Sequence, residues 1–242
     1  MIRSPKELAE AKQPVQRLSQ TEKLLLRYEE SRDWAANNQR ILVAAGVGVV
    51  AIVVGLWWWA GQKKVNNGHA ATYLSRILGD YLSGNYRQAI DGDMKRKVQG
   101  DPVYGLRYIV REFGSTEAGN EAALALGNSY YYLGKYDSAR AAFGDASSSY
   151  PIVHASIEAG RAAILEHSGN KIEAAKLFES AAKRDNTNPL DADYLLSAAR
   201  DEEQAGQRED AIRLYREIRE QYQLTPFDDA AKRALMQMNV EL

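Results

Sequence analysis

The sequence has no cysteine among its 242 residues and only three histidines. The lack of cysteine excludes disulfides, zinc–thiolate sites, iron–sulfur clusters and cysteine nucleophiles. The histidines, His69, His154 and His167, lie far apart in the sequence, and none belongs to an HExxH or comparable metal-binding spacing. We therefore expect no metal site and no cofactor.

The sequence also lacks an excess of charge of either sign. Its 31 basic and 32 acidic residues are interspersed, which excludes the basic surface typical of nucleic-acid-binding proteins. The basic cluster at residues 95–97 is expected to be a solvated loop. The sequence therefore predicts no nucleic-acid partner.

Catalytic motifs are missing as well. No serine has a GxSxG context, and no SxxK pair occurs. Gly46 and Gly48 lie inside an apolar run, so they cannot form a phosphate-binding loop. Carboxylates are plentiful, but exposed helix faces account for them. The sequence predicts a protein that is not an enzyme and has no small-molecule substrate.

Residues 41–61 form an apolar run without a single charge. A helix of this length reaches roughly 30 Å, the thickness of the hydrocarbon core of a bilayer. Trp57, Trp58 and Trp59 lie near its end, just before Lys63 and Lys64, where indole rings favour the headgroup boundary. The run predicts one transmembrane helix, with these three tryptophans at the membrane interface and the lipid bilayer as a partner.

A cleaved secretory signal is the main alternative to this anchor. It normally has a short basic leader and a shorter apolar stretch, whereas forty mostly polar residues precede this run. Lysine and arginine number four in residues 21–40 and three in residues 61–80, which barely informs orientation. We place the N-terminus in the cytoplasm because a single internal anchor commonly leads a long C-terminal domain across the membrane.

The regions next to the anchor carry weaker signals. Residues 1–40 are expected to form a polar cytoplasmic arm, with Leu18, Leu25 and Tyr28 on an amphipathic helix or a loosely ordered solvated one. Residues 62–70 are expected to be a juxtamembrane linker. Within the anchor, small residues on one face could admit a second helix, although such residues are common in these segments: Ala44, Gly48, Ala51 and Gly55.

A repeated frame follows residue 70. In three segments a glycine is followed five residues later by alanine and nine residues later by an aromatic residue, with periods of 35 and 37 residues. The segments contain Gly134, Ala139 and Phe143; Gly169, Ala174 and Phe178; and Gly206, Ala211 and Tyr215. A fourth, decayed copy has only Gly84 and Ala89 in frame.

This frame predicts helix hairpins. Glycine in a short turn ends the first helix, the small alanine lets two backbones approach, and the aromatic ring fills the gap to the next hairpin. One hairpin cannot bury its apolar face alone, so neighbours must stack. Three dipeptides offer a capping side chain followed by proline and predict helix starts: Asp101–Pro102, Asn188–Pro189 and Thr225–Pro226.

The copy at residues 120–153 resembles the tetratricopeptide repeat. Seven positions are in register with that family: Leu126, Gly127, Tyr130, Ala139, Phe143, Ala146 and Pro151. The predicted fold class is all-α, a single N-terminal transmembrane helix followed by an α-solenoid of tetratricopeptide-like helix hairpins over residues 71–242.

Taken whole, the chain resembles the YfgM-like family, the ancillary subunit of the bacterial SecYEG translocon. It looks closer still to membrane-anchored homologues of the Bacteroidetes and Chlorobi groups, through AIDGD at 89–93 and REFGSTEAGNEAAL at 111–124. The resemblance implies a bacterial inner-membrane protein with a periplasmic C-terminal domain. Its implied partners are the translocon, a periplasmic chaperone or another membrane complex.

In tetratricopeptide stacks the first helix of each hairpin lines a concave groove that binds peptides or helices of partners. Carried onto this chain, the groove positions are Glu121, Leu124, Asn128, Tyr131, Tyr132, Glu166, His167, Arg200, Glu203 and Gln204. Each could equally be an ordinary solvent-facing or inter-repeat residue. Some repeats of this family clamp a terminal carboxylate with lysine and asparagine, but Leu124 replaces the lysine here, so no such clamp is predicted.

Two functions without catalysis remain open from the sequence, and an enzyme with an unrecognised kind of site is a third alternative. The first is a scaffold or adaptor without catalysis, which binds proteins in its groove and assists export or envelope assembly. The second is a structural subunit that stabilises a specific membrane complex through its transmembrane helix.

Overall fold

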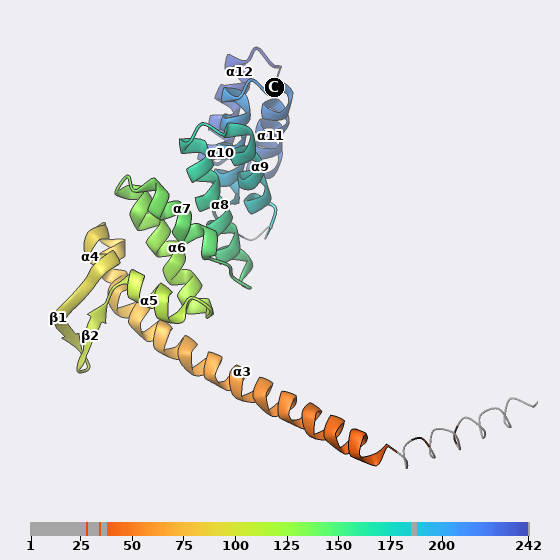
Figure 1. Cartoon of the computed structure of the whole chain (residues 1–242). Coiled ribbons are helices and arrows are strands. Elements are labelled where there is room, and N and C mark those ends of the chain that lie inside the picture. The colour runs from red at the N-terminus through yellow and green to blue at the C-terminus, as the bar shows by residue number, and fades with distance from the viewer. Residues whose placement is uncertain (1–27, 29–33, 35–37, 185–187, 242) are drawn as a thin grey trace, which may run out of the picture. The chain divides into compact units, whose positions relative to one another are not determined.

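The computed structural model describes Tyr28, Trp34 and residues 38–184 and 188–241 (Figure 1). By its internal contacts the chain divides into two compact units, Met1–Ala60 and Gly61–Leu242. Leu18 and Leu25 lie outside the described residues, so the amphipathic helix of the arm stays a prediction.

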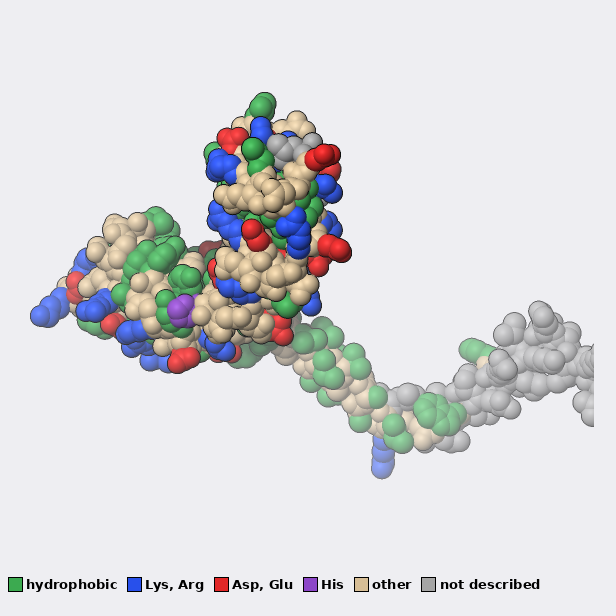
Figure 2. All heavy atoms as spheres, turned by 90° about the horizontal axis from the view of Figure 1, so that it is seen from above, with side chains coloured by type: hydrophobic (Ala, Val, Ile, Leu, Met, Phe, Trp, Pro, Cys, Tyr) green, Lys and Arg blue, Asp and Glu red, His purple; other side chains and the backbone are tan. Residues whose placement is uncertain are grey.

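Helix α3, Gln39–Leu82, contains the apolar run. By length and composition it is the one helix in the described part of the chain that could cross a membrane. The most apolar stretch of α3 is 0% buried among the described residues, and Trp57 is 78% exposed. Figure 2 shows this segment covered by hydrophobic side chains, whereas basic and acidic ones are interspersed over the repeats. Residues 62–70, expected as a linker, are helical and continue α3.

A β-hairpin interrupts the helices early in the second unit. Helix α4, Tyr86–Asp91, leads into strands β1, Gly92–Val98, and β2, Asp101–Tyr104, which pair antiparallel. Gln99 and Gly100 both have positive φ (53° and 91°), as the tightest hairpin turns require. Helix α5, Leu106–Phe113, follows.

This hairpin corrects two expectations. Asp101–Pro102 does not start a helix, because Pro102 lies in β2, at the edge position where a strand tolerates proline. Residues 95–97 are not a loop but part of β1, held to α3 by the ion pair of Arg96 with Asp80. The all-α class holds with this one local exception among the described residues.

The repeats follow as paired helices. The first hairpin is α6, Glu117–Tyr132, with α7, Tyr136–Asp145. The second is α8, Pro151–His167, with α9, Lys171–Ala182, and the third is α10, Asp191–Gln204, with α11, Arg208–Gln221. Helix α12, Pro226–Gln237, packs against α11 and α10. This order confirms the predicted stack of hairpins.

The predicted frame occupies the expected places. The turn glycines Gly84, Gly134, Gly169 and Gly206 all have positive φ, between 71° and 83°. The alanines that follow them, Ala89, Ala139, Ala174 and Ala211, are fully buried, and the aromatic residues Phe143, Phe178 and Tyr215 are at most 6% exposed. The frame therefore determines both the turns and the inter-repeat core.

Of the other two predicted helix starts, one is confirmed and one is wrong. Thr225 is the N-cap of α12, and its Oγ1 accepts from the Asp228 N–H at 3.3 Å. Asn188–Pro189 does not start α10, which begins at Asp191. The Asn188 side chain instead accepts from the Leu190 N–H at 3.0 Å, which holds the chain in a turn for two more residues.

Replacing Thr225 with alanine is expected to lower the free energy of unfolding by about 1 kcal/mol, because the Asp228 N–H loses its acceptor. Chemical denaturation followed by circular dichroism measures this change. Thr225→Ser keeps the hydroxyl and should stay within a few tenths of the wild type, and an equal loss in both variants would contradict the capping role.

Candidate protein-binding groove

A groove of about 340 Å³ crosses the first helices of the three hairpins, α6, α8 and α10. Helix α8 contributes only small residues, Ser156, Ala159, Gly160 and Ala163. Helix α6 supplies Leu124, Asn128, Tyr131 and Tyr132, and the start of α10 supplies Leu190, Asp193 and Tyr194. Small side chains between two rows of larger ones create the hollow.

Polar groups of the groove are held by neighbours in the repeats and at the C-terminal end of α3. The Asn128 amide donates to the Tyr81 hydroxyl at 3.2 Å, and the hydroxyls of Ser156 and Tyr194 lie 3.3 Å apart. Burial raises the pKa of Tyr194, and the nearby carboxylates of Asp193 and Asp191 add to the rise. Tyr194 therefore stays a neutral phenol at physiological pH, able to donate and accept hydrogen bonds.

Aromatic rings continue from the groove along the hairpin turns. Tyr132 is 64% exposed and stacks on Tyr86, with ring centroids 4.9 Å apart. Tyr131 meets Tyr136 edge to face at 5.5 Å, and Tyr136 stacks on His167. These contacts fix the orientation of the exposed rings before any partner binds, which lowers the entropic cost of binding.

Four of the predicted groove residues line this hollow: Leu124, Asn128, Tyr131 and Tyr132. The other six do not line it: Glu121, Glu166, His167, Arg200, Glu203 and Gln204. Several of these contact residues of their own or neighbouring helices. His167 stacks on Tyr136, Glu203 accepts from the Tyr215 hydroxyl at 2.7 Å, and Glu166 lies 3.9 Å from Lys171.

The groove runs obliquely across the helices, which explains the misplaced residues. To compare equivalent positions in the three repeats, we convert residue numbers to those of α6. The conversion subtracts 35 from residue numbers in α8, and 72, the sum of 35 and 37, from those in α10. In this frame the lining residues span 124–132 on α6, 121–128 on α8 and 118–122 on α10. The groove therefore moves about one helical turn toward the N-terminal end at each repeat, as expected where successive repeats are rotated. Arg200, Glu203 and Gln204 lie beyond its α10 end.

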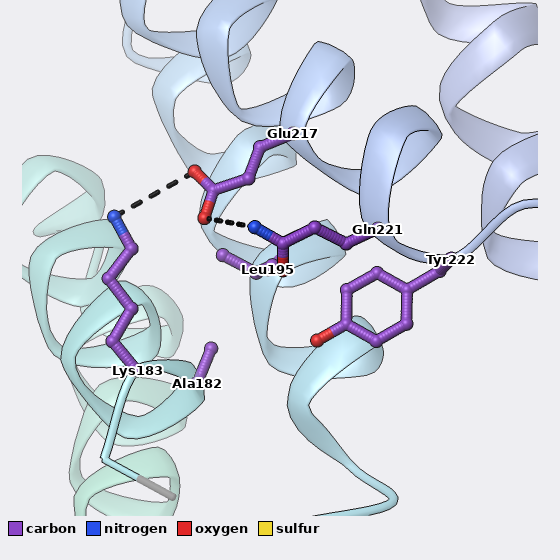
Figure 3. A pocket seen from close by; sticks show the side chains of 6 residues that line it. All are labelled: Ala182, Lys183, Leu195, Glu217, Gln221 and Tyr222. Atoms are coloured by element: carbon purple, nitrogen blue, oxygen red, sulfur yellow. Dashed lines mark hydrogen bonds and ion pairs between the residues drawn. The ribbon is translucent and has the colours of Figure 1, made fainter. Parts of the chain in front are cut away.

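A second hollow, about 360 Å³, lies between α9, α10 and α11 and is more polar (Figure 3). Figure 3 shows the side chains of Lys183 and Gln221 converging on the Glu217 carboxylate, at 3.7 and 3.4 Å. Because these groups already bind one another, the hollow offers fewer available polar groups to a partner. Among the described residues, no group of three histidines or carboxylates is placed to hold a metal ion.

Comparison with known proteins agrees with this geometry. Residues 124–189 match the family model described as tetratricopeptide repeat, and this segment runs from within α6 to just before α10. No curated protein and no solved structure gives a significant match. The stacked hairpins have the fold of tetratricopeptide repeats, and such repeats point to a scaffold for protein–protein interactions.

Proposed function

We propose that this protein is a membrane-tethered scaffold that binds a segment of a partner protein in the groove across α6, α8 and α10. The observation that carries the proposal is the groove itself, a hollow shared by three successive repeats with pre-oriented tyrosines on its wall. Its lining mixes apolar, aromatic and hydrogen-bonding groups, which suits an extended peptide or one face of a helix.

The carboxylate of Asp193 makes the groove favour a bound segment with a positive charge. It is exposed at the start of α10, and none of the described residues that line the groove is lysine or arginine. We therefore expect the bound segment to combine apolar side chains with a basic residue that faces Asp193.

The tether supplies the second part of the mechanism. A binding site held at a membrane meets partners of the same membrane at a raised effective concentration, so modest groove affinity suffices. The chain's resemblance to ancillary translocon subunits directs this proposal to the periplasmic face of a bacterial inner membrane. There the partners would be the translocon, a periplasmic chaperone or an envelope complex, and the role would be assistance in export or envelope assembly.

Site-specific cross-linking tests the groove. With a photoreactive amino acid at Tyr131, in the groove, we expect discrete cross-links to one or a few partner proteins in native membranes. The same amino acid at Arg200, which is exposed beyond the groove, should give markedly fewer. Equal patterns at both positions, or cross-links only to lipid and abundant soluble proteins, would refute the groove as the binding site.

An alternative function is a structural subunit that contacts a membrane complex through α3. The small residues Ala44, Gly48, Ala51 and Gly55 support it, because a Cβ added at either glycine would meet nothing within 4 Å. Another helix could approach closely along this face.

A further inference from the structure

Residues directly after the apolar run are bound to the repeats. Within the second unit, the Asn67 side chain accepts from the Ala118 N–H at 2.9 Å, which joins α3 to the first turn of α6. Ala70, one turn further along α3, is fully buried. The membrane-proximal part of α3 is therefore fixed to one end of the repeat stack.

Glu117 extends this junction to the connection between α7 and α8. Its carboxylate accepts from the hydroxyls of Ser148 and Ser149, at 2.7 and 2.5 Å, and from the Ser149 N–H at 3.2 Å. Burial alone would raise the pKa of Glu117, but these hydrogen bonds and the charge of Lys63 lower it below its ordinary value. Lys63 and the serine-rich connection therefore act on the same carboxylate.

The depth of this junction follows from helix geometry. Lys63 is two residues past Gly61, the end of the apolar run, or about 3 Å along the helix. The headgroup layer on each side of a bilayer is roughly 5–8 Å thick. If α3 spans the bilayer as proposed above, Lys63 and the groups near it lie at headgroup depth.

Two apolar side chains at this end of the domain face solvent. Tyr150 is 55% exposed and Ile152 is 45% exposed, on either side of Pro151 at the start of α8. A tyrosine has an apolar ring and a polar tip, which favours the boundary between headgroups and hydrocarbon. Transfer of an exposed aromatic and aliphatic pair from water into this boundary lowers the free energy of the system.

We infer that the α7–α8 connection and the first residues of α8, together residues 146–152, contact the lipid surface, with Tyr150 and Ile152 inserted among the headgroups. The occupant is lipid because the same chain leaves the bilayer close by, at residues 61–64. This contact rests on the proposed anchor. It gives the domain a second attachment, which restricts its tilt against the membrane and holds the groove in one orientation to the membrane.

The absence of cysteine makes the test direct, because single-cysteine variants can each carry one environment-sensitive fluorophore. The sites are Tyr150→Cys, Val50→Cys within the apolar run, and Met236→Cys on α12. Met236 is 56% exposed, which matches Tyr150. The labelled full-length protein is reconstituted into vesicles of phosphatidylethanolamine and phosphatidylglycerol, and quenching by lipids with a headgroup nitroxide or an acyl-chain nitroxide is measured.

We expect the label at position 150 to shift its emission to shorter wavelength and to be quenched by the headgroup nitroxide, while the label at 236 is not. Only lipid is present, so a protein partner cannot produce this result. If the label at position 50 is quenched by acyl-chain nitroxides but position 150 behaves like 236, the anchor stands and the lipid contact is refuted. If position 50 is not quenched either, the anchor fails and the contact fails with it.

Discussion

Truncating Phe143 to alanine is expected to lower the free energy of unfolding by about 3–5 kcal/mol. The ring is 1% exposed and lies between two helices of neighbouring hairpins, against Gly127 of α6 and Gly160 of α8. Its removal leaves a void between α6 and α8 at the groove, which Phe143 also lines, and these rigid helices cannot close it. Chemical denaturation of the full chain in mild detergent, followed by circular dichroism, measures the loss.

The two glycines that contact Phe143 allow a second test of this packing, with Gly144 as the matched control. A Cβ at Gly127 or Gly160 would lie 2.4 or 2.5 Å from the ring, so the ring cannot move away from one without approaching the other. Gly160→Ala should therefore destabilise the domain by about 1–2 kcal/mol, because overpacking exceeds the gain in helix propensity. Gly144→Ala, where a Cβ would meet nothing within 4 Å, should instead be neutral or stabilising by up to about 1 kcal/mol. Similar effects in both variants would contradict the packing argument.

The double variant Tyr132→Ala, Asp193→Ser is expected to reduce partner binding by roughly 30-fold or more, the effect of losing an interface hot spot worth about 2 kcal/mol. Tyr132 offers a fixed aromatic surface and Asp193 the groove's carboxylate, and both are exposed, so the fold should survive. Co-purification of partners with the full-length protein in mild detergent measures the change. Met236→Ala, exposed but outside the groove, is the control.

The same measurement separates the two proposed functions. If Gly48→Leu and Gly55→Leu abolish co-purification while the groove variant leaves it intact, the transmembrane helix makes the decisive contact. The protein is then a structural subunit rather than a groove-based scaffold. The opposite order of effects supports the scaffold.

Much of the fold could be predicted from the sequence because its signals are local. The turn at Gly134 needs a residue with positive φ, which glycine adopts readily, so the end of the helix is visible in the local sequence. An alanine followed by an aromatic residue at a fixed spacing repeats the same packing at each hairpin. The β-hairpin at residues 92–104 is harder to predict from the sequence. Its turn residues, Gln99 and Gly100, are only a weak hairpin signal, and Asp101–Pro102 resembles a helix start when read alone.

Which residues line the groove depends on the rotation between successive repeats, and the sequence of a single repeat does not contain this rotation. Leu124, Asn128, Tyr131 and Tyr132 were found because the first complete repeat gives their positions directly. Leu190, Asp193 and Tyr194 were missed because a fixed period carries equivalent positions forward without rotation, whereas the groove shifts by about one turn per repeat.

The sequence by itself determined the apolar run, the hairpin turns and the residues between repeats, since each depends on backbone conformation or on neighbours a few residues away. Only the tertiary structure decided which side chains share the groove, how the start of α6 joins the α7–α8 connection to the residues that follow the apolar run, and where a β-hairpin replaces a helix. These depend on the angle between successive hairpins and on contacts between residues far apart in the chain, which local patterns do not encode.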